Sequence, residues 1–324
     1  MDAKNLLAKL ISFNTVNDKE NEAVLDFIEE YLSGLGFHTD YRSKCLVMSI
    51  GEEQPIGFLG HTDTVSASDN WKTNPFKLTE KDGKLYGLGA CDMKGGIAAM
   101  LAAVSRVDWS KHPGMKMYFT FDEETDFGGI LELLDKNLSF PDKMIIGEPT
   151  DNEVINSSKG LVTAKVYFTG KTAHASTPEK GVNAIHNCAE FIYRLREIMG
   201  VETATVNVGV ISGGRAINIV PEHCEIGIDF RTDKSEQNKV IEKALSYFSS
   251  LYGARYEITS NLLPFVAKKD VKMCDFITEA SFLSSKERII LGVGPVNPHA
   301  DNEYIEAKSL KKLESQYLEL ISSC

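Results

Sequence analysis

The sequence has no closely spaced cysteine pair, no long apolar run and no basic cluster, and each absence excludes a class of protein. Its six cysteines are scattered without a C-x-x-C spacing, which argues against a disulfide framework and favours reduced, mostly buried thiols. No window of about 18 uninterrupted apolar residues occurs, so no membrane span is predicted. The N-terminal stretch MDAKNLLAKLISF lacks the basic and apolar regions of a signal peptide. Together these features favour a cytoplasmic protein.

The charge of the chain argues against a nucleic-acid-binding protein. The chain has 35 basic and 46 acidic residues, a formal net charge of −11, and no basic run, so nucleic acid is not an expected partner. An acidic protein favours cationic substrates over polyanions. With 324 residues the chain is long enough for two domains, or for one large domain with an insertion.

The glycine-rich stretch GLGACDMKGG, residues 87–96, raises the question of a phosphate-binding turn. A dinucleotide fingerprint needs G-x-G-x-x-G, but here the third position is Asp92, whose carboxylate would repel a pyrophosphate. A P-loop is excluded as well, because no G-K-[ST] follows. A nucleotide-binding oxidoreductase is therefore set aside, and Asp92 needs another explanation.

Apolar patterning predicts an α/β fold for the first half of the chain. Short apolar runs that read as strands alternate with helical stretches, which predicts a mostly parallel mixed sheet flanked by helices. A helix is expected after a capping-box-like start at Asn17 and Glu20. Residues 77–87 are predicted to form a hairpin around Asp82-Gly83, and the small, apolar residues 95–107 a buried helix.

The pattern changes near Lys159. Strands with alternating polarity are expected at 161–170, 202–213 and 223–231, with two amphipathic helices at 181–198 and 235–253, which together suggest an inserted α+β unit. Residues 261–265 read as its exit linker, followed by a helix, a strand (RIILG) and a last helix ending near Ile321. The predicted domains are therefore 1–158 with 266–324, and 159–265.

Acidic and imidazole side chains follow the predicted strands of the first region. The carboxyl ends of strands form the ligand crevice of open α/β sheets, so these side chains should converge there. They are His61 with Asp63, Asp92, the triplet Asp122-Glu123-Glu124, and Glu148. Carboxylates at close range repel one another unless a cation compensates, and a metal ion is the simplest such cation. With His299 as a second imidazole, the set exceeds one tetrahedral zinc but fits two ions that share a carboxylate.

Five motifs, in order, carry a resemblance to a known family. GHTDTV, LYGLGACDMKGG, FDEET, IIGEPT and GKTAHASTPEKGVNAI resemble the dizinc amidohydrolases that include acetylornithine deacetylase, succinyl-diaminopimelate desuccinylase and carboxypeptidase G. The match runs from His61 to His299 and so covers most of the chain. The resemblance implies a zinc-peptidase-like catalytic domain with an inserted lid and dimerisation domain, and a homodimer paired through that lid.

The resemblance also assigns roles within the catalytic domain. It implies that Asp92 bridges two zinc ions, for which cobalt can substitute, and that the Asp92–Met93 peptide bond is cis. One ion would take His61 and Glu148, and the other Glu124 and His299. Glu123 corresponds to the general base, which takes a proton from the attacking water and passes it to the leaving nitrogen. Asp63 corresponds to the carboxylate that orients the imidazole of His61.

In the lid, the resemblance implies that His174 reaches the partner subunit's site and polarises the scissile carbonyl. Asn218 and Arg231 match substrate-binding positions, where Arg231 would grip a carboxylate with both arms of its guanidinium. For Arg231 an ion pair within the lid stays an open alternative, and Arg215 is a further candidate for substrate binding.

The expected reaction is hydrolysis of the amide bond of a small N-acyl amino acid, above all N-acetylornithine, which implies a place in arginine biosynthesis. A desuccinylase and a di- or carboxypeptidase stay open within the family. A non-catalytic metal-binding protein is the alternative outside it, against which the presence of Glu123 and every ligand argues.

Overall fold

The computed structural model describes residues 1–17, 19–199, 205–267 and 269–324, which form two compact units. Unit 1 comprises Met1–Asn156, Asp270–Lys272 and Thr278–Cys324. Unit 2 comprises Ser157–Lys269 and Met273–Ile277. Within the described ranges, no helix has the length and apolar character needed to cross a membrane.

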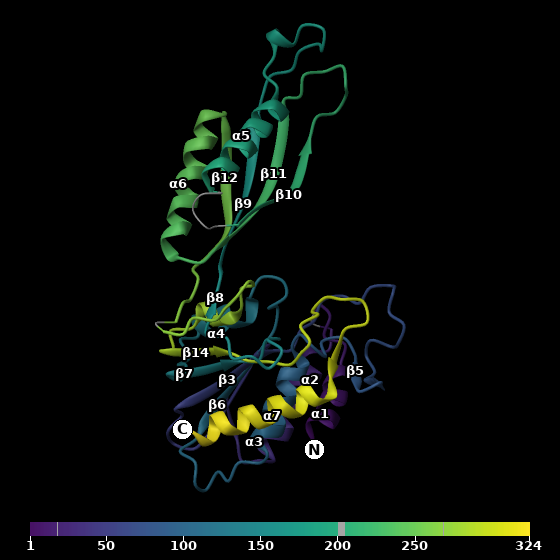
Figure 1. Ribbon diagram of the computed structural model, residues 1–324, viewed down its shortest axis with the longest axis vertical. Coiled ribbons are helices and arrows are strands. Elements are labelled where there is room, and N and C mark those ends of the chain that lie inside the picture. Colours follow the sequence, from purple (N-terminus) through teal and green to yellow (C-terminus); the bar gives the residue numbers. More distant parts are fainter. Residues whose placement is uncertain (18, 200–204, 268) are drawn as a thin grey trace. The chain divides into compact units, whose positions relative to one another are not determined.

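Unit 1 is built on a six-stranded mixed sheet (Figure 1). In spatial order its strands are β1 (His38–Arg42), β2 (Leu46–Ile50), β6 (Met115–Thr120), β3 (Ile56–His61), β7 (Lys143–Ile146) and β14 (Glu287–Ile290). The pairings of β1 with β2 and of β2 with β6 are antiparallel. The other three pairings are parallel, so β6, β3, β7 and β14 end at one edge. The predicted α/β fold with a mixed sheet is confirmed.

Helices cover the sheet of unit 1 because both of its faces are apolar. The helices are α1 (Ala3–Ile11), α2 (Asn21–Ser33), α3 (Lys94–Val104), α4 (Gly128–Asp135) and α7 (Ala307–Ser322). Alternate sheet residues such as Phe58 and Met117 join one core with α1, α2, α3 and α7. The helix α3 is buried along its whole length, as its small and apolar residues predict.

A small antiparallel sheet lies beside this core, in the order β15 (Tyr304–Glu306), β5 (Lys84–Tyr86) and β4 (Thr79–Lys81). Asp82 and Gly83 join β4 to β5 with φ values of 53° and 74°. Positive φ at both central residues is what a type I′ hairpin turn requires, and Asp-Gly supplies it. The hairpin prediction is confirmed.

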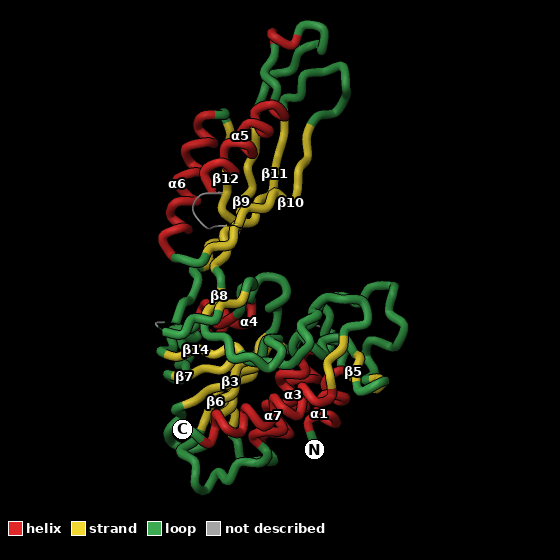
Figure 2. Tube along the Cα trace, in the orientation of Figure 1, coloured by secondary structure: helices red, strands yellow, loops and turns green. Residues whose placement is uncertain are grey.

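Unit 2 contains a four-stranded antiparallel sheet covered by two helices (Figure 2). The strands, in spatial order, are β10 (Thr205–Gly213), β11 (His223–Thr232), β9 (Gly160–Thr169) and β12 (Ala254–Leu262). The helices α5 (Ala184–Met199) and α6 (Ser235–Leu251) pack with alternate strand residues into a second core. A short 3-10 helix, Pro178–Lys180, and a parallel pair of β8 (Ser157–Ser158) with β13 (Met273–Cys274) complete the unit.

Three local predictions differ from the structure. The helix expected after Asn17 begins at Asn21, because Asn17 has φ 50° and the Glu20 carboxylate accepts from the Asn14 amide instead of capping the helix. The expected linker 261–265 begins inside β12. The helix expected before β14 is, in the described residues, a 3-10 turn at Glu279–Phe282. Of the strand expected at 202–213, residues 202–204 lie outside the described residues.

Candidate metal centre

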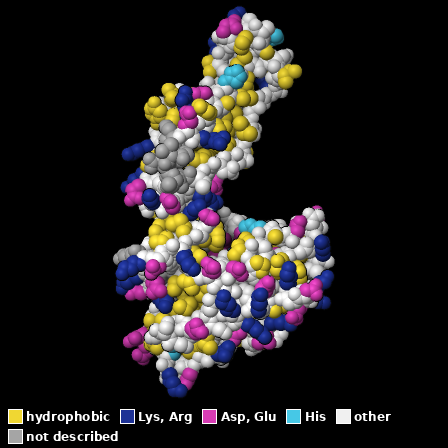
Figure 3. Space-filling model, in the orientation of Figure 1, with side chains coloured by type: hydrophobic (Ala, Val, Ile, Leu, Met, Phe, Trp, Pro, Cys, Tyr) yellow, Lys and Arg dark blue, Asp and Glu magenta, His cyan; other side chains and the backbone are white. Residues whose placement is uncertain are grey.

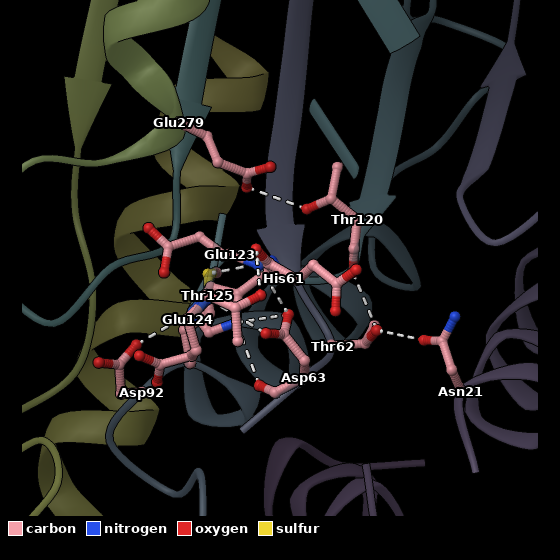
Figure 4. Close-up of polar contacts among 12 residues, drawn as sticks. Asn21, His61, Thr62, Asp63, Asp92, Thr120, Glu123, Glu124, Thr125 and Glu279 are labelled. Atoms are coloured by element: carbon pink, nitrogen blue, oxygen red, sulfur yellow. Dashed lines mark hydrogen bonds and ion pairs between the residues drawn. The ribbon is translucent and has the colours of Figure 1, made fainter. Parts of the chain in front are cut away.

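The carboxyl edge of the unit 1 sheet brings together most of the side chains that the sequence singles out (Figure 4). His61 is the last residue of β3, Glu123 and Glu124 follow β6, and Glu148 follows β7. Asp92 reaches the same place from the turn before α3. The Asp92–Met93 peptide bond is cis, so that prediction is confirmed.

His61 lies at the centre of the cluster and is fully buried. Its Nε2 is 3.1 Å from Asp92 Oδ1 and 3.9 Å from Glu148 Oε1. Its Nδ1 is 3.1 Å from the backbone oxygen of Asp63 and 3.4 Å from Asp63 Oδ1. Burial disfavours the charged ring, but the hydrogen bonds with Asp63 and Asp92 outweigh it and raise the pKa of His61 well above its usual value.

Asp63 does more than face the imidazole. Its two carboxylate oxygens accept the backbone N–H groups of Glu123 and Glu124, at 3.3 and 3.2 Å. Burial opposes its ionisation, but the hydrogen bond from His61 and these backbone donors lower its pKa. An ionised Asp63 therefore ties the end of β3 to the turn after β6.

His299 approaches from the C-terminal part of unit 1. Its Nε2 lies 2.9 Å from Glu124 Oε2 and 3.8 Å from Asp92 Oδ2. The hydrogen bond with Glu124 raises the pKa of His299 against partial burial. Unlike His61, whose side chain has no exposed surface, the His299 side chain is 53% exposed and forms the open side of the cluster.

Two groups of side chains present ligand atoms within 4.8 Å of one another, and they share His61. One is His61, Glu123 and Glu148, and the other is His61, Asp92 and Glu124. Both mix imidazole with carboxylate, which suits zinc and other divalent transition metals.

The electrostatics of the cluster also fit a metal ion. Burial, with the neighbouring carboxylates, raises the pKa values of Glu123 and Glu148 well above their usual range. Glu148 Oε1 is buried with no hydrogen-bond partner among the described residues. A buried carboxylate oxygen without a partner is costly, and a cation next to it removes that cost.

Two buried glutamates of unit 1 are not identified by the sequence analysis. Glu279 is fully buried, and its Oε2 accepts from Thr120 Oγ1 at 2.9 Å (Figure 4). Burial raises the pKa of Glu279 to about 7. Glu303 is 2% exposed and accepts from backbone amides of the glycine-rich turn. The only sequence signal for Glu303 is its place four residues after His299.

The other predicted residues belong to unit 2. His174 is exposed, its Nδ1 lies 2.7 Å from Ser176 Oγ, and the backbone N–H of Ala175 donates to the oxygen of Asn218. The loop that carries Asn218 therefore lies beside His174. Arg215 is exposed, 4.0 Å from Glu222.

Arg231, by contrast, is already engaged within unit 2. Its guanidinium donates to both carboxylate oxygens of Asp229, at 2.9 and 3.0 Å. This is the ion pair that the sequence left open as an alternative. To bind Arg231, a substrate carboxylate would have to displace Asp229 or share the guanidinium with it.

Comparison with known proteins agrees with this geometry. Residues 57–323 match the model of peptidase family M20/M25/M40. The chain is 31% identical to an acetylornithine deacetylase from Pasteurella multocida (strain Pm70), over 90% of this chain and 88% of that protein.

Solved structures share the fold. A tripeptidase from Staphylococcus aureus aligns with a TM-score of 0.84 at 25% identity, covering 99% of this chain and 97% of that one. A dinuclear metal-binding peptidase from Bacillus subtilis aligns with a TM-score of 0.76 at 13% identity, covering 98% and 96%. The chain therefore belongs to peptidase family M20/M25/M40, a family of hydrolases.

Proposed function

We propose that this protein is a two-metal amide hydrolase that removes the acetyl group from N-acetylornithine or a closely related N-acyl amino acid. The observation that carries the proposal is the convergence of two imidazoles and the carboxylates of Asp92, Glu124 and Glu148 beside Glu123. The 31% identity to an acetylornithine deacetylase supports the choice of substrate. This activity would place the enzyme in arginine biosynthesis.

In the proposed centre His61 and Glu148 would hold one zinc ion, Glu124 and His299 would hold the other, and Asp92 would serve both. The short distances from Asp92 to both imidazoles, 3.1 and 3.8 Å, support a shared carboxylate. Two bound metal ions would supply the positive charge that polarises the scissile carbonyl and eases deprotonation of water. Cobalt is expected to substitute for zinc.

Glu123 is the proposed general base. It takes a proton from water while the water oxygen bonds to the carbonyl carbon, and it passes that proton to the leaving nitrogen as the tetrahedral intermediate collapses. The C–N bond then breaks, and acetate and the amine are released. Burial raises the pKa of its carboxyl, which is the direction that a base operating near neutral pH needs. Asp63 positions both the His61 ring and the backbone of Glu123.

We further propose that unit 2 is the lid and dimerisation domain. The edge strand β10 pairs with β11 on one side, and no second partner strand occurs in the described part of the chain. Val210, Ile211 and Ile217, on or next to this edge, are 63%, 60% and 103% exposed. Figure 3 shows apolar side chains (yellow) on the visible face of unit 2. Edge strands and exposed apolar side chains are common sites of pairing between chains.

Within such a homodimer, His174 is proposed to stabilise the developing oxyanion in the partner's site, with Asn218, Arg215 and Arg231 binding the substrate. The side-by-side placement of the His174 and Asn218 segments supports a shared role. The six free cysteines, five of them buried, support an enzyme of the reducing cytoplasm.

A hydrolysis panel tests the substrate. Purified protein loaded with zinc or cobalt is assayed with N-acetylornithine, succinyl-diaminopimelate, dipeptides and tripeptides. The expected result is the highest kcat/KM for N-acetylornithine, and a kcat about 10²–10⁴-fold lower for the Glu123→Ala variant prepared in the same way. Preferential release of succinate or of amino acids from peptides would replace the deacetylase with a desuccinylase or peptidase. No hydrolysis of any member would contradict the proposal.

A further inference from the structure

The glycine-rich turn that resembles a phosphate-binding turn holds a carboxyl group, and that group belongs to a side chain of the same chain. Glu303 Oε2 accepts the backbone N–H of Gly89 at 2.8 Å. Glu303 Oε1 accepts the N–H groups of Cys91 and Asp92 at 2.6 and 3.0 Å. With 2% of its surface exposed, Glu303 has little access to water, so these amides are its main partners.

The glycine at residue 89 is part of this arrangement. Gly89 has φ +76°, and an added Cβ would lie 2.7 Å from Thr64 Cγ2. A residue with a side chain would therefore be strained there, and glycine lets the backbone turn its N–H toward the carboxylate. Successive backbone N–H groups that converge in this way form an anion-binding concavity.

Glu303 also connects two segments that are far apart in the sequence. It lies four residues after His299, while its carboxylate holds the turn that ends in Asp92. Its backbone oxygen accepts the N–H of Gly87, which adds a second link to the same turn. The Asn297 side chain closes the His299 loop by bonding to the backbone N–H and oxygen of Tyr304. The positions of His299 and Asp92 are therefore coupled through Glu303.

We propose that Glu303 is a positioning residue that fixes the Asp92 carboxylate relative to His299 and so sets the spacing of the two metal positions. The proposal rests on the proposed two-metal function. Glu303 would touch neither substrate nor metal, and would act through the backbone that carries Asp92. Burial raises the pKa of Glu303 to about 7, and the hydrogen bonds from Gly89, Asp92 and Cys91 oppose that rise. The ionised carboxylate suits this role because it only accepts hydrogen bonds, and all three groups facing it are donors.

The substitution Glu303→Gln tests this with little change in size. A glutamine can accept from Cys91 and Asp92 through its oxygen, but its NH₂ group would face the N–H of Gly89. One buried donor is then left without an acceptor, and the turn has to shift. Tyr118→Phe is the matched control, because it removes one partly buried hydrogen bond of unit 1, to the Ser139 oxygen, away from the turn.

The main measurement is cobalt binding without substrate. Each protein is titrated with Co²⁺ after metal removal, and the visible absorption of the bound ion is followed. In a separate experiment each zinc-loaded protein competes with a chelator for zinc. Partners that orient metal ligands typically contribute about 10–100-fold in metal affinity. Glu303→Gln is expected to lose affinity in that range and to show an altered cobalt spectrum, while Tyr118→Phe keeps the wild-type spectrum. In the panel assay Glu303→Gln should lower kcat, with KM nearly unchanged.

The outcomes separate the two proposals. If the wild type binds two cobalt ions but hydrolyses nothing in the panel, the proposed substrate is wrong while the cobalt data still decide the role of Glu303. A wild-type spectrum and wild-type metal affinity in Glu303→Gln would overturn the positioning role. If Glu303→Gln does not fold, Glu303→Asp decides, because it keeps a carboxylate but shortens its reach to the amides of Gly89, Cys91 and Asp92. An altered cobalt spectrum in that variant supports the role, and an unchanged one overturns it.

Discussion

The candidate residues of unit 1 and unit 2 are held in opposite ways. In unit 1 the side chains at the sheet edge are buried: His61 is 0%, Asp63 5% and Glu148 4% exposed. In unit 2 His174 and Asn218 are exposed: the His174 ring contacts Ser176 in its own loop, and the Asn218 backbone oxygen accepts the N–H of Ala175 in that same loop. The first set is fixed by the core before any ligand binds, whereas the second can adapt to a substrate or a partner chain.

This difference lowers the stability of the metal-free protein through charge repulsion in unit 1, but not in unit 2. Buried carboxylates that lie near one another destabilise the fold unless a cation compensates, while exposed side chains remain solvated. The carboxylate cluster of unit 1 is therefore preorganised, but it lowers the local stability of the fold. Substitutions in unit 1 should change metal binding, chemistry or both, and those in unit 2 should change turnover without changing metal content.

The largest effect is expected from Asp92→Ala. If Asp92 is shared by both metal positions, its loss removes a ligand from each, so the variant should bind less than two metal ions and show no measurable hydrolysis. Metal analysis after zinc loading and dialysis checks this. Asp69→Ala, at an exposed position, is the control and should behave as the wild type. Two tightly bound ions in Asp92→Ala would exclude a shared carboxylate.

Glu123→Gln separates chemistry from metal binding within unit 1. A general base typically contributes about 10²–10⁴-fold, so kcat should fall by that factor, while zinc content and thermal stability stay near those of the wild type. Steady-state kinetics with metal analysis of the same sample is the measurement. Turnover within a few-fold of the wild type would rule out Glu123 as the base.

His174→Ala tests whether an exposed residue of unit 2 contributes to turnover without affecting the metal. Loss of an oxyanion donor typically costs about 10²–10³ in kcat, and here metal content should not change, since His174 belongs to unit 2. The trans arrangement gives a sharper test. In a mixed dimer of Glu123→Gln and His174→Ala chains, one site has both residues intact and the other lacks both. Re-equilibrated mixtures should therefore regain part of the activity, and mixtures that stay inactive would place His174 in cis or outside the mechanism.

The sequence predicts those site residues and turns that neighbouring residues in the chain identify. His61, Glu124 and Glu148 follow apolar strands, and Asp82-Gly83 marks its hairpin, so neighbouring residues suffice. The missed residues depend on distant partners. Glu279 meets Thr120 across 159 residues, and Glu303 meets Gly89 across 214. No local pattern marks a carboxylate whose acceptor role is defined only after the chain has folded.

The wrong helix start has a related cause. Asn17 and Glu20 have the spacing of a capping box, but the Glu20 carboxylate bonds to the Asn14 amide of the preceding loop. The backbone N–H of Asn14 therefore competes with the capping interaction for the Glu20 carboxylate, and the helix does not start at Asn17. The same reasoning applies to Arg231, whose expected substrate contact competes with Asp229 two residues away.

The smallest expected effect concerns stability and tests whether burial in unit 1 has the cost assigned to it. Glu279 is fully buried, and its folded pKa of about 7 lies above the usual value of 4.5. Because the folded state holds this proton more tightly, the stabilisation is complete below the unfolded pKa and is lost as the pH rises through about 7. The metal-free wild type should therefore lose stability between about pH 5 and pH 8 relative to Glu279→Gln, which cannot ionise.

The size of that loss is bounded by the shift itself. Each unit of pKa corresponds to about 1.4 kcal/mol, so the difference between the two proteins should change by about 3 kcal/mol at most. Urea unfolding of both proteins across this pH range, with Glu257→Gln as an exposed control from unit 2, measures it. The control should follow the wild type, and zinc loading should reduce the pH dependence because nearby positive charge favours the ionised carboxylate. Parallel stability curves for the wild type and Glu279→Gln would show that burial at this position has no electrostatic cost, and the contrast between the two units would then rest on geometry alone.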